Sequence, residues 1–430
     1  MILHELTRYD VYKNSVIEWL PEIPYHWGIN HLKRFCVKIT DGAHTSPDLS
    51  SSDYPFLTVV NLENGALDFK NCLYTSREDY EKLVRNGCQP RKYDVLYSKD
   101  GTISETTVIH ENKNFVVGSS FIIITPQLRK IDSIFLCYLL SSSIMRYQAG
   151  IYIKGASLPR ISIFNIAKLL SIFPPINDQK AIADYLDTKT ALIDSKIDLL
   201  TQKAIKCGEL KQSLISETVT RGLDKTVAMK DSGVEWIGEV PEHWKVQRVK
   251  ELFDISRGRV IAQTELIDDG IYPVYSSQTK DDGCLGYIDT FDYEGEYITW
   301  TTDGVNAGTV FLRSGRFNCT NICGTLKLNK KCNVIGYLAY SLQVSAKHNK
   351  RIDTNGAKIM SNEMMFIKIT VPPETEQKEI ADFLDIKTAH IDRIVQTINT
   401  QIEKFKELRK TLINDVVTGK IKVTLTGDAV

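Results

Sequence analysis

The sequence lacks any long apolar run. Its longest apolar stretches, IFLCYLL at 134–140 and FIIIT at 121–125, are far shorter than the ~20 residues that a membrane-spanning helix needs. It also lacks an excess of one charge, because 53 Lys and Arg residues face 53 Asp and Glu residues. We therefore expect a soluble protein that is not basic overall, so any binding surface must arise from the local distribution of charge.

Cysteine is sparse and has no regular spacing. The nine cysteines form an odd, scattered set, and no secretory leader precedes them, which argues against a disulfide framework. Cys319 and Cys323 stand close together, but FNCTNICGTLKL is typical of two strands around a turn, and no second Cys/His pair lies at zinc spacing. The sequence therefore predicts a cytoplasmic, reduced protein without a metal site.

The motifs of cofactor-dependent enzymes are missing as well. The chain has no G-x-G-x-x-G or Walker A loop, and its two Pro-Pro pairs follow Phe173 and Val371 rather than the Asn or Asp of an amino-methyltransferase. We predict no catalytic residue and no cofactor in this chain. The alternative is a Mg-dependent DNA endonuclease using Asp48, Asp68 and Lys70, a pattern that the second half of the chain does not repeat.

Two distinctive segments each occur twice. Residues 15–27, SVIEWLPEIPYHW, match residues 232–244, SGVEWIGEVPEHW, at seven of thirteen positions. Residues 174–194, PPINDQKAIADYLDTKTALID, match residues 372–392, PPETEQKEIADFLDIKTAHID, at fourteen of twenty-one positions. Because the borders are kept while the interiors differ, the chain is interpreted as a tandem duplication in which one scaffold presents two variable modules.

The tryptophans and histidines of the first repeated segment are interpreted as structural. Trp27 and Trp244 can fix the chain where a module meets a helix end. A single histidine beside each of them, His26 and His243, is expected to be a hydrogen-bonded packing residue rather than a catalyst.

Short strands and turns dominate both modules. The stretches YPFLTVVNL, NFVVGSSFIIIT, EYITWTT and GTVFLRSG are rich in β-branched and aromatic residues and are bounded by Gly, Asn, Asp and Pro. Helical patches such as SIFLCYLLSSSIMRYQ and NVIGYLAYSLQVSAK interrupt them. The pattern predicts an α+β fold.

After each Pro-Pro pair we expect a helix of roughly 40 residues, about 60 Å long. That length exceeds the diameter of a module of ~130 residues, whose radius of gyration is about 14 Å. The expected fold therefore has two α+β domains separated by two long antiparallel coiled-coil helices, with internal pseudo-two-fold symmetry. The helix seam, which recurs at heptad spacing, comprises Leu186, Ile193, Ile197, Leu200, Leu214, Leu384, Ile391, Val395, Ile398, Ile402, Phe405 and Leu412.

The modules carry what basic excess there is. Between residues 27 and 174 there are 17 Lys and Arg against 13 Asp and Glu, and between 244 and 372 there are 16 against 14. Polar turns in the modules mix Arg, Lys, Gln, Ser and Thr, the side chains that reach base edges and phosphates, so we expect them to form a DNA-facing rim. The candidate DNA-binding residues in these turns are Lys99, Thr102, Lys154, Ser157, Arg160, Arg257, Arg259, Ser277, Gln278, Lys280 and Lys358.

The chain resembles the specificity subunit of a type I restriction-modification system over nearly its whole length. The resemblance lies in the SGVEWIGEVPEHW opening, the SKDGTI turn and the QKxIADxLDxKTAxID start of each long helix. The first opening departs from the second at Leu20-Pro21, and NGAKIMSNE at 355–363 lacks the proline of GASLPRIS. The expected domains are target-recognition domain 1 at 1–173, spacer helix 1 at 174–223, target-recognition domain 2 at 224–371 and spacer helix 2 at 372–430.

The resemblance implies a non-catalytic subunit that reads a bipartite, asymmetric double-stranded DNA site and directs other subunits to it. The implied partners are two modification (methyltransferase) subunits and the motor-nuclease subunits of restriction, with S-adenosylmethionine, ATP and Mg on those partners. A coiled-coil adaptor that binds no DNA is the remaining alternative. It would differ in lacking salt-dependent DNA retention.

Overall fold

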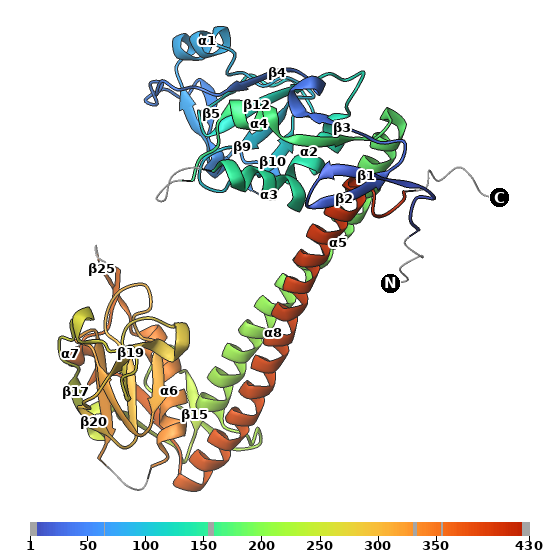
Figure 1. Cartoon of the computed structure of the whole chain (residues 1–430). Helices are drawn as coiled ribbons and strands as arrows, with labels where there is room; N and C mark the ends of the chain where they lie inside the picture. The colour runs from blue at the N-terminus through green and yellow to red at the C-terminus, as the bar shows by residue number, and fades with distance from the viewer. Residues whose placement is uncertain (1–6, 64, 154–158, 330–332, 354–355, 424–430) are drawn as a thin grey trace. The chain divides into compact units, whose positions relative to one another are not determined.

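The computed structural model describes residues 7–63, 65–153, 159–329, 333–353 and 356–423. The chain divides into two compact units, one formed by residues up to 200 together with those from 400 onward, the other by residues 201–399. Two long helices, α5 (Ile176–Arg221) and α8 (Glu374–Val417), each run from one unit into the other (Figure 1). The expected helices are confirmed, with 46 and 44 residues.

A four-stranded antiparallel sheet forms the centre of the first module, in the order β10-β9-β12-β4. Its strand β12 is apolar and almost wholly buried, and neighbouring strands pair with both of its edges. A second sheet pairs β11 in parallel with β5, which is antiparallel to β8. The strands are β4 (Cys36–Asp41), β5 (Tyr54–Leu57), β8 (Leu73–Thr75), β9 (Val95–Ser98), β10 (Thr106–Val108), β11 (Val116–Val117) and β12 (Phe121–Pro126).

The second module repeats this topology strand for strand. Its antiparallel sheet has the order β22-β21-β24-β17, and its second sheet pairs β18 in parallel with β23 and antiparallel with β19. β20 is an additional strand of that sheet. The strands are β17 (Phe253–Arg257), β18 (Tyr272–Tyr275), β19 (Cys284–Ile288), β20 (Tyr293–Glu294), β21 (Tyr297–Thr301), β22 (Val310–Arg313), β23 (Arg316–Cys319) and β24 (Cys323–Leu328).

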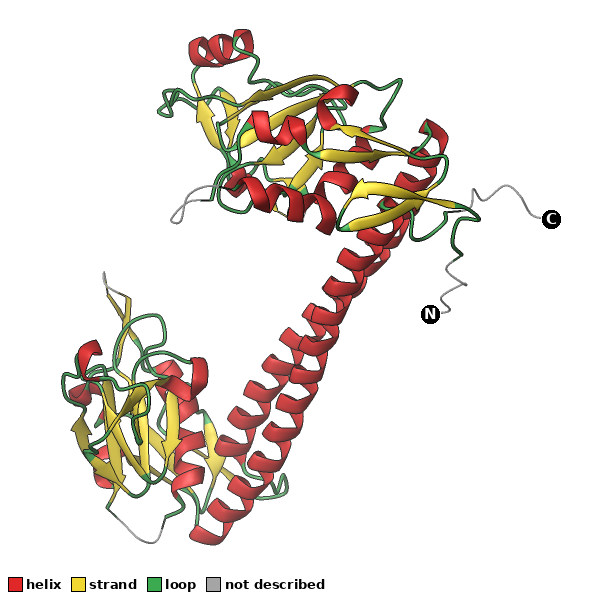
Figure 2. Ribbon diagram, viewed as in Figure 1, coloured by secondary structure: helices red, strands yellow, loops and turns green. Residues whose placement is uncertain are grey.

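Short helices accompany these sheets (Figure 2). The stretch SIFLCYLLSSSIMRYQ forms two helices rather than one, because Ser142 is extended (ψ 155°) and its hydroxyl caps the second helix by accepting from Met145 N. The short helices are α1 (Arg77–Arg85), α2 (Ser133–Ser141), α3 (Ser143–Tyr152), α4 (Ile163–Lys168), α6 (Ile335–His348) and α7 (Ser361–Met364).

Pairs of short strands frame the borders of the modules. The strand that leads into each Pro-Pro pair is antiparallel to the strand that follows the repeated tryptophan. The remaining strands form hairpins. The border strands are β3 (Gly28–His31) with β13 (Leu170–Phe173) and β16 (Lys245–Arg248) with β27 (Lys368–Val371); the hairpins are β1 (Tyr12–Ile17) with β2 (Leu20–Pro24), β6 (Leu62–Glu63) with β7 (Ala66–Leu67), β14 (Met229–Asp231) with β15 (Glu239–Pro241), and β25 (Arg351–Asp353) with β26 (Gly356–Lys358).

The two long helices are antiparallel within each unit. In the first unit Asp194 of α5 pairs with Arg409 of α8 at 3.0 Å, and Lys196 lies over the ring of Phe405 at 5.7 Å. Partner numbers on α8 therefore fall as those on α5 rise. Every residue of the expected seam is buried or half-buried: Leu186, Ile193, Leu384, Ile391, Ile398 and Ile402 are buried, and Ile197, Leu200, Leu214, Val395, Phe405 and Leu412 are half-buried.

The repeated tryptophan segments dock on the ends of the long helices. Trp244 is fully buried against Gly222, directly after α5, and Trp27 is fully buried against Gly419, shortly after α8. Both glycines have positive φ, 73° and 76°, the conformation that ends a helix. Each module therefore opens against a helix C-terminus, and the first module uses the end of the helix that is last in the chain.

The histidines of these segments bind the first turn of the helix that follows their own module. His26 Nε2 lies 2.9 Å from Asp178 Oδ2, and His243 Nε2 lies 2.6 Å from Glu376 Oε1. An acid in the first turn also suits the positive end of the helix dipole. The structural interpretation of these residues agrees with their contacts.

Candidate nucleic-acid interface

In each module an Asp-Gly turn follows an inner strand of the main sheet, β9 in the first module and β21 in the second. Asp100 pairs with Arg160, and Asp303 pairs with Lys358, as isolated antiparallel bridges. Gly101 N donates to Pro159 O and Gly304 N donates to Ala357 O, both at 3.1 Å. Two polar turns that are separate in the sequence are therefore joined by the backbone in the same way in both modules.

A second loop is fixed equally in both modules at the end of the outer strand. Gly42 N donates to Phe121 O and Gly258 N donates to Cys323 O, both at 3.0 Å. A Cβ at either glycine would lie 2.1 or 2.2 Å from a carbonyl oxygen, so only glycine fits. The two modules thus build one backbone frame, which we call the rim: residues 41–44, 98–106, 118–120 and 159–161, and residues 257–260, 301–309, 320–322 and 356–359.

The side chains on this common frame differ between the modules. Where the first rim has Asp41 beside Lys99, joined at 2.7 Å, the second has Arg257 and Thr302. Arg257 is exposed and its Nε donates to Asn321 O, whereas Thr302 Oγ1 donates to Ile322 O at 3.1 Å. The same backbone therefore presents a neutralised ion pair in one module and an exposed cation in the other.

The candidates of the first module lie in different settings. Lys99 is only 6% exposed, and its ammonium is ion-paired with Asp41 at 2.7 Å, so it lies beneath the exposed surface of the rim. Arg160 forms two bonds with Asp100, at 2.7 and 3.2 Å, while staying exposed, and Thr102 is exposed at the turn tip. Lys154 and Ser157 lie outside the described residues. That any of them contacts DNA stays a prediction.

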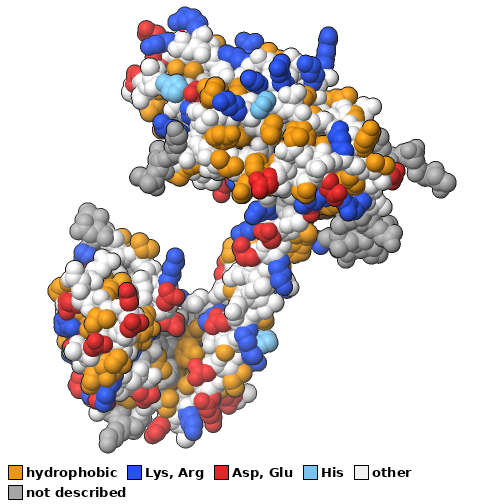
Figure 3. Space-filling view, viewed as in Figure 1, with side chains coloured by type: hydrophobic (Ala, Val, Ile, Leu, Met, Phe, Trp, Pro, Cys, Tyr) orange, Lys and Arg blue, Asp and Glu red, His pale blue; other side chains and the backbone are white. Residues whose placement is uncertain are grey.

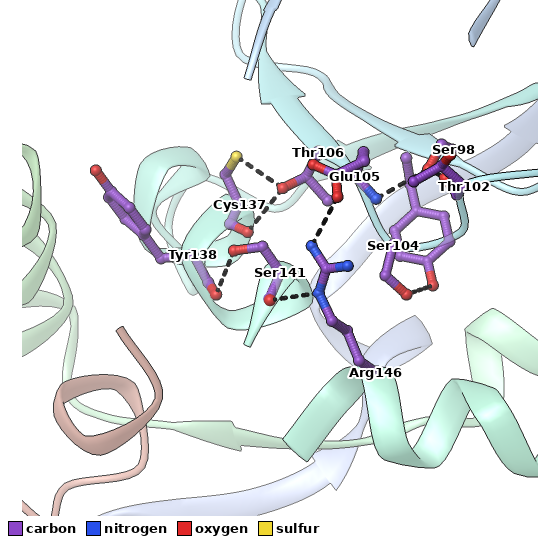
Figure 4. Close-up of polar contacts among 10 residues, drawn as sticks. Ser98, Thr102, Ser104, Glu105, Thr106, Cys137, Tyr138, Ser141 and Arg146 are labelled. Carbon is purple, nitrogen blue, oxygen red and sulfur yellow. Dashed lines mark hydrogen bonds and ion pairs between the residues drawn. The ribbon is translucent and has the colours of Figure 1, made fainter. Parts of the chain in front are cut away.

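Figure 4 shows how the Asp-Gly turn of the first module is held. Ser98 Oγ donates to Thr102 O at 2.5 Å and accepts from Glu105 N at 2.8 Å. Arg146 Nη2 donates to Glu105 Oε1 at 3.0 Å, and its Nε donates to Ser141 O at 2.9 Å. The residues on both sides of the exposed tip are therefore held by hydrogen bonds, which limits how far Thr102 can move.

The candidates of the second module lie on neighbouring loops. Arg259 bonds Glu265 at 3.1 Å and Asp292 at 3.0 Å, and these acceptors, Glu265 first, raise the pKa of its guanidinium. Ser277 accepts through its carbonyl from Asn306 Nδ2 at 2.9 Å. The other candidates of this module are Gln278, which donates to Cys284 O, the exposed Lys280 and the half-buried Lys358.

Arg313 supports the loop that carries these polar residues. Its guanidinium lies 3.6 Å from the ring centre of Tyr275 and donates to Asp282 O. Asp281 and Asp282 both have positive φ, 49° and 50°, so the turn requires support. Burial lowers the pKa of the Arg313 guanidinium, and aromatic faces and carbonyls take the place of water around it.

The sequence interpretation missed the turn TTDGVNAG at 301–308. Its Asp303, Val305 and Asn306 belong to the rim as fully as the SKDG turn does. The available signal was the Asp-Gly pair itself, which follows a strand in both modules. Asp41 and His44, bonded at 2.9 Å, were also missed, although an Asp-Gly pair, Asp41-Gly42, stands at the end of a strand there too.

The alternative nuclease residues bond their own neighbours. Asp48 accepts from Ser50 N at 2.9 Å, and Asp68 accepts from Asn71 Nδ2 at 2.7 Å. Hydrogen bonds from Ser50 lower the pKa of Asp48, and those from Asn71 and Lys70 lower the pKa of Asp68. Across the described ranges no three His, Cys, Asp or Glu side chains are grouped so as to hold a metal ion.

On the face drawn in Figure 3, Lys and Arg side chains are scattered over the first module among apolar and acidic ones, and charges of both signs lie along the helices. In the part of the chain that the structure describes, no helix has the length and apolar character to cross a membrane. The described cysteines are all free thiols.

Residues 37–205 and 241–404 each match the family model described as type I restriction modification DNA specificity domain. The specificity subunit of the type I restriction enzyme MpnII of Mycoplasma pneumoniae is 37% identical over 161 residues, 37% of this chain and 48% of that protein. That of the enzyme MjaVIII of Methanocaldococcus jannaschii is 22% identical over 400 residues, 86% of either chain. One solved structure, described as the basis of complex assembly and conformational transition of a type I restriction-modification system, contains a similar chain. The TM-score is 0.68 at 13% identity, and the match covers 93% of this chain and 99% of that chain, so the likeness is one of fold.

Proposed function

This chain belongs to the family of type I restriction-modification DNA specificity domains, and on that premise we propose that it reads a bipartite, asymmetric DNA target, one half-site with each module. It is a specificity subunit and not an enzyme, since the family is one of DNA sequence recognition. The observation that carries the proposal is the rim: one backbone frame built twice, with different side chains at equivalent positions. Two rims with the same backbone can each approach a groove of the same duplex in the same way. Because their side chains differ, the two half-sites that they read should differ as well.

The proposal extends to the complex in which the chain acts. Two modification subunits bind the chain, and motor-nuclease subunits join for restriction. S-adenosylmethionine, ATP and Mg are held by those partners. The duplication supports two modification subunits, because each repeat presents an equivalent module and helix start to one copy. Sequencing-based mapping of methylated bases in cells that carry the chain and its modification partner would give the target directly.

Exchanging one module tests whether each module reads its own half-site. Replacing residues 28–173 with those of another family member should change one half of the methylated motif and leave the other half as it was. The matched exchange of residues 245–371 should change only the opposite half. If either exchange altered both halves, the modular reading proposed for this chain would be wrong.

The salt dependence of DNA binding distinguishes the proposed function from the alternative of a coiled-coil adaptor. A chain that contacts phosphates loses affinity for duplex DNA steeply as salt rises, because bound counterions are released. A purely protein-binding adaptor would retain no duplex at any salt concentration. Retention of a duplex by the purified chain, measured across a salt series, decides between them.

A further inference from the structure

Val305 is the most conspicuous apolar side chain of the second rim. It is 98% exposed, above every other large exposed hydrophobic residue in the part of the chain that the structure describes. It follows Gly304, which has a φ of 88°, at the tip of the Asp-Gly turn. An apolar side chain presented this openly gains free energy only when a partner covers it.

The turn that carries Val305 is held on three sides. Thr302 N donates to Ile322 O at 3.0 Å, Gly304 N donates to Ala357 O at 3.1 Å, and Asn306 Nδ2 donates to Ser277 O at 2.9 Å. These bonds tie it to two neighbouring rim loops, at Ile322 and Ala357, and to the loop of Ser277 outside the rim. Within the turn, Ala307 N donates to Gly304 O at 3.0 Å, which closes the tip around Val305. The exposure of Val305 is therefore the property of a fixed tip.

Basic side chains lie around this tip, and the turn itself carries the acid Asp303. The backbone of Asp303 pairs with that of Lys358 in an isolated β-bridge, and the side chain of Lys350 lies against Gly308 at the other end of the turn. Arg257 is bonded to Asn321, in the loop that receives Thr302. An apolar tip among cations fits a polyanion that offers an apolar group at a fixed depth, and DNA does so in the major groove through the thymine methyl group.

We propose that Val305 is a specificity-determining residue that contacts the 5-methyl group of a thymine in the half-site read by the second module. The inference rests on the proposed function and adds the base and the group that is recognised. Valine has no hydrogen-bonding atom in its side chain, so the other atoms exposed on the base edges in the major groove would gain nothing from it. Thr102, which follows Gly101 in the first module, occupies the equivalent position and keeps a hydroxyl.

The test uses the complex of the full chain with its modification partner and a duplex carrying the mapped target. Each thymine of the second half-site, on either strand, is replaced in turn by deoxyuridine, which lacks only the methyl group. At one position the wild-type complex should bind about fourfold more weakly, the worth of one buried methyl group. The V305S complex should bind thymine and deoxyuridine equally, with an unchanged melting temperature because the residue is exposed.

The matched control is T102S, which should leave the deoxyuridine effect in the second half-site unchanged. A wild-type complex that binds its target yet is indifferent to every deoxyuridine would overturn this inference alone. So would a half-site without thymine, or a V305S chain that fails to assemble with the modification partner, which would make Val305 a protein contact. A wild-type complex that retains no duplex would overturn the proposed function, and this inference with it.

Discussion

The two repeated tryptophans are buried alike but are bonded differently. Trp244 Nε1 donates to Glu376 Oε2 at 2.9 Å, whereas Trp27 Nε1 has no acceptor among the described residues. Both are fully buried, so replacing either with alanine should cost about 3 kcal/mol or more of unfolding free energy. Replacement with phenylalanine keeps most of the apolar packing and so isolates the contribution of the indole hydrogen bond. Trp244→Phe should cost about 1 to 2 kcal/mol more than Trp27→Phe, because only the former loses a bond to a carboxylate.

Urea unfolding, followed by far-UV circular dichroism, measures both phenylalanine variants. Equal losses in the two variants would show that the Trp244 bond contributes nothing net. Retained stability with lost DNA recognition in the alanine variants would move these residues from the fold into the binding surface.

Arg313 gives a second expectation at this scale. Arg313→Lys should lower the unfolding free energy by about 1 to 2 kcal/mol, because a lysine cannot stack flat on Tyr275 while it also reaches Asp282 O. The matched control is Arg77→Lys on helix α1, an exposed residue that pairs with Glu81 at 2.9 Å and should change stability by less than about 0.5 kcal/mol. Thermal melts of both variants compare them. A control as damaging as the test variant would contradict the role assigned to Arg313.

The long helices carry the expectation at the scale of elements. Inserting four residues after Thr201 and four after Asn399 adds about one turn, roughly 6 Å, to both helices and nearly keeps their apolar faces in register. DNA rises 3.4 Å per base pair, so the gap between half-sites should grow by one or two pairs while both half-sites persist. Mapping methylated bases for the lengthened chain measures the gap. An active variant with the original gap would mean that helix length does not set the spacing.

The long helices were predictable because their signal is local. A heptad of apolar residues, no internal proline and a Pro-Pro start are all read within one segment, and the residues so chosen are the ones that lie buried or half-buried. Helix α1 was missed although Ser76, which accepts from Asp79 N at 3.2 Å, is a recognisable cap. Only Tyr80, Leu83 and Val84 are apolar among its 9 residues, which is too short a run to show a helical period in the sequence.

The rim was predictable only in pieces. The polar turns could be recognised one at a time, but their meeting depends on strand pairing between distant segments, as in the bridge of Asp100 with Arg160. The burial of Lys99 depends likewise on Asp41, at the end of a strand far away in the sequence. A surface lysine and a buried ion-paired lysine look the same in a sequence, because the difference lies in the partner.

At the scale of the whole molecule, the first and the last described segments of the chain lie in contact within one unit. Lys422 N donates to Thr7 O at 2.8 Å, and Tyr12 OH donates to Gly419 O at 2.8 Å. The contact of Trp27 with Gly419 across the ends repeats the contact of Trp244 with Gly222 inside the chain. The chain should therefore tolerate circular permutation, with residue 430 joined to residue 1 and new ends opened between 224 and 225.

We expect the permuted chain to fold with the melting temperature of the natural chain and to direct methylation to the same motif. A permutation with new ends inside β24 (Cys323–Leu328), in the buried centre of a sheet, serves as the control and should not fold. If the 224/225 permutant also did not fold, the contact of Gly222 with Trp244 would be insufficient to hold α5 on the second module, and the covalent link between them would be required.

The order in which a ribosome makes this chain differs from the order in which its parts fit together. The apolar core around Trp27 includes Ile413, Val416, Val417 and Ile421, which are synthesised only after the whole second module. The core around Trp244 is complete once α8 has passed its first turns, since it ends with Leu384. The module made first is thus the one finished last, and during synthesis its tryptophan face stays exposed to chaperones and to other nascent chains until the end of α8 has been translated.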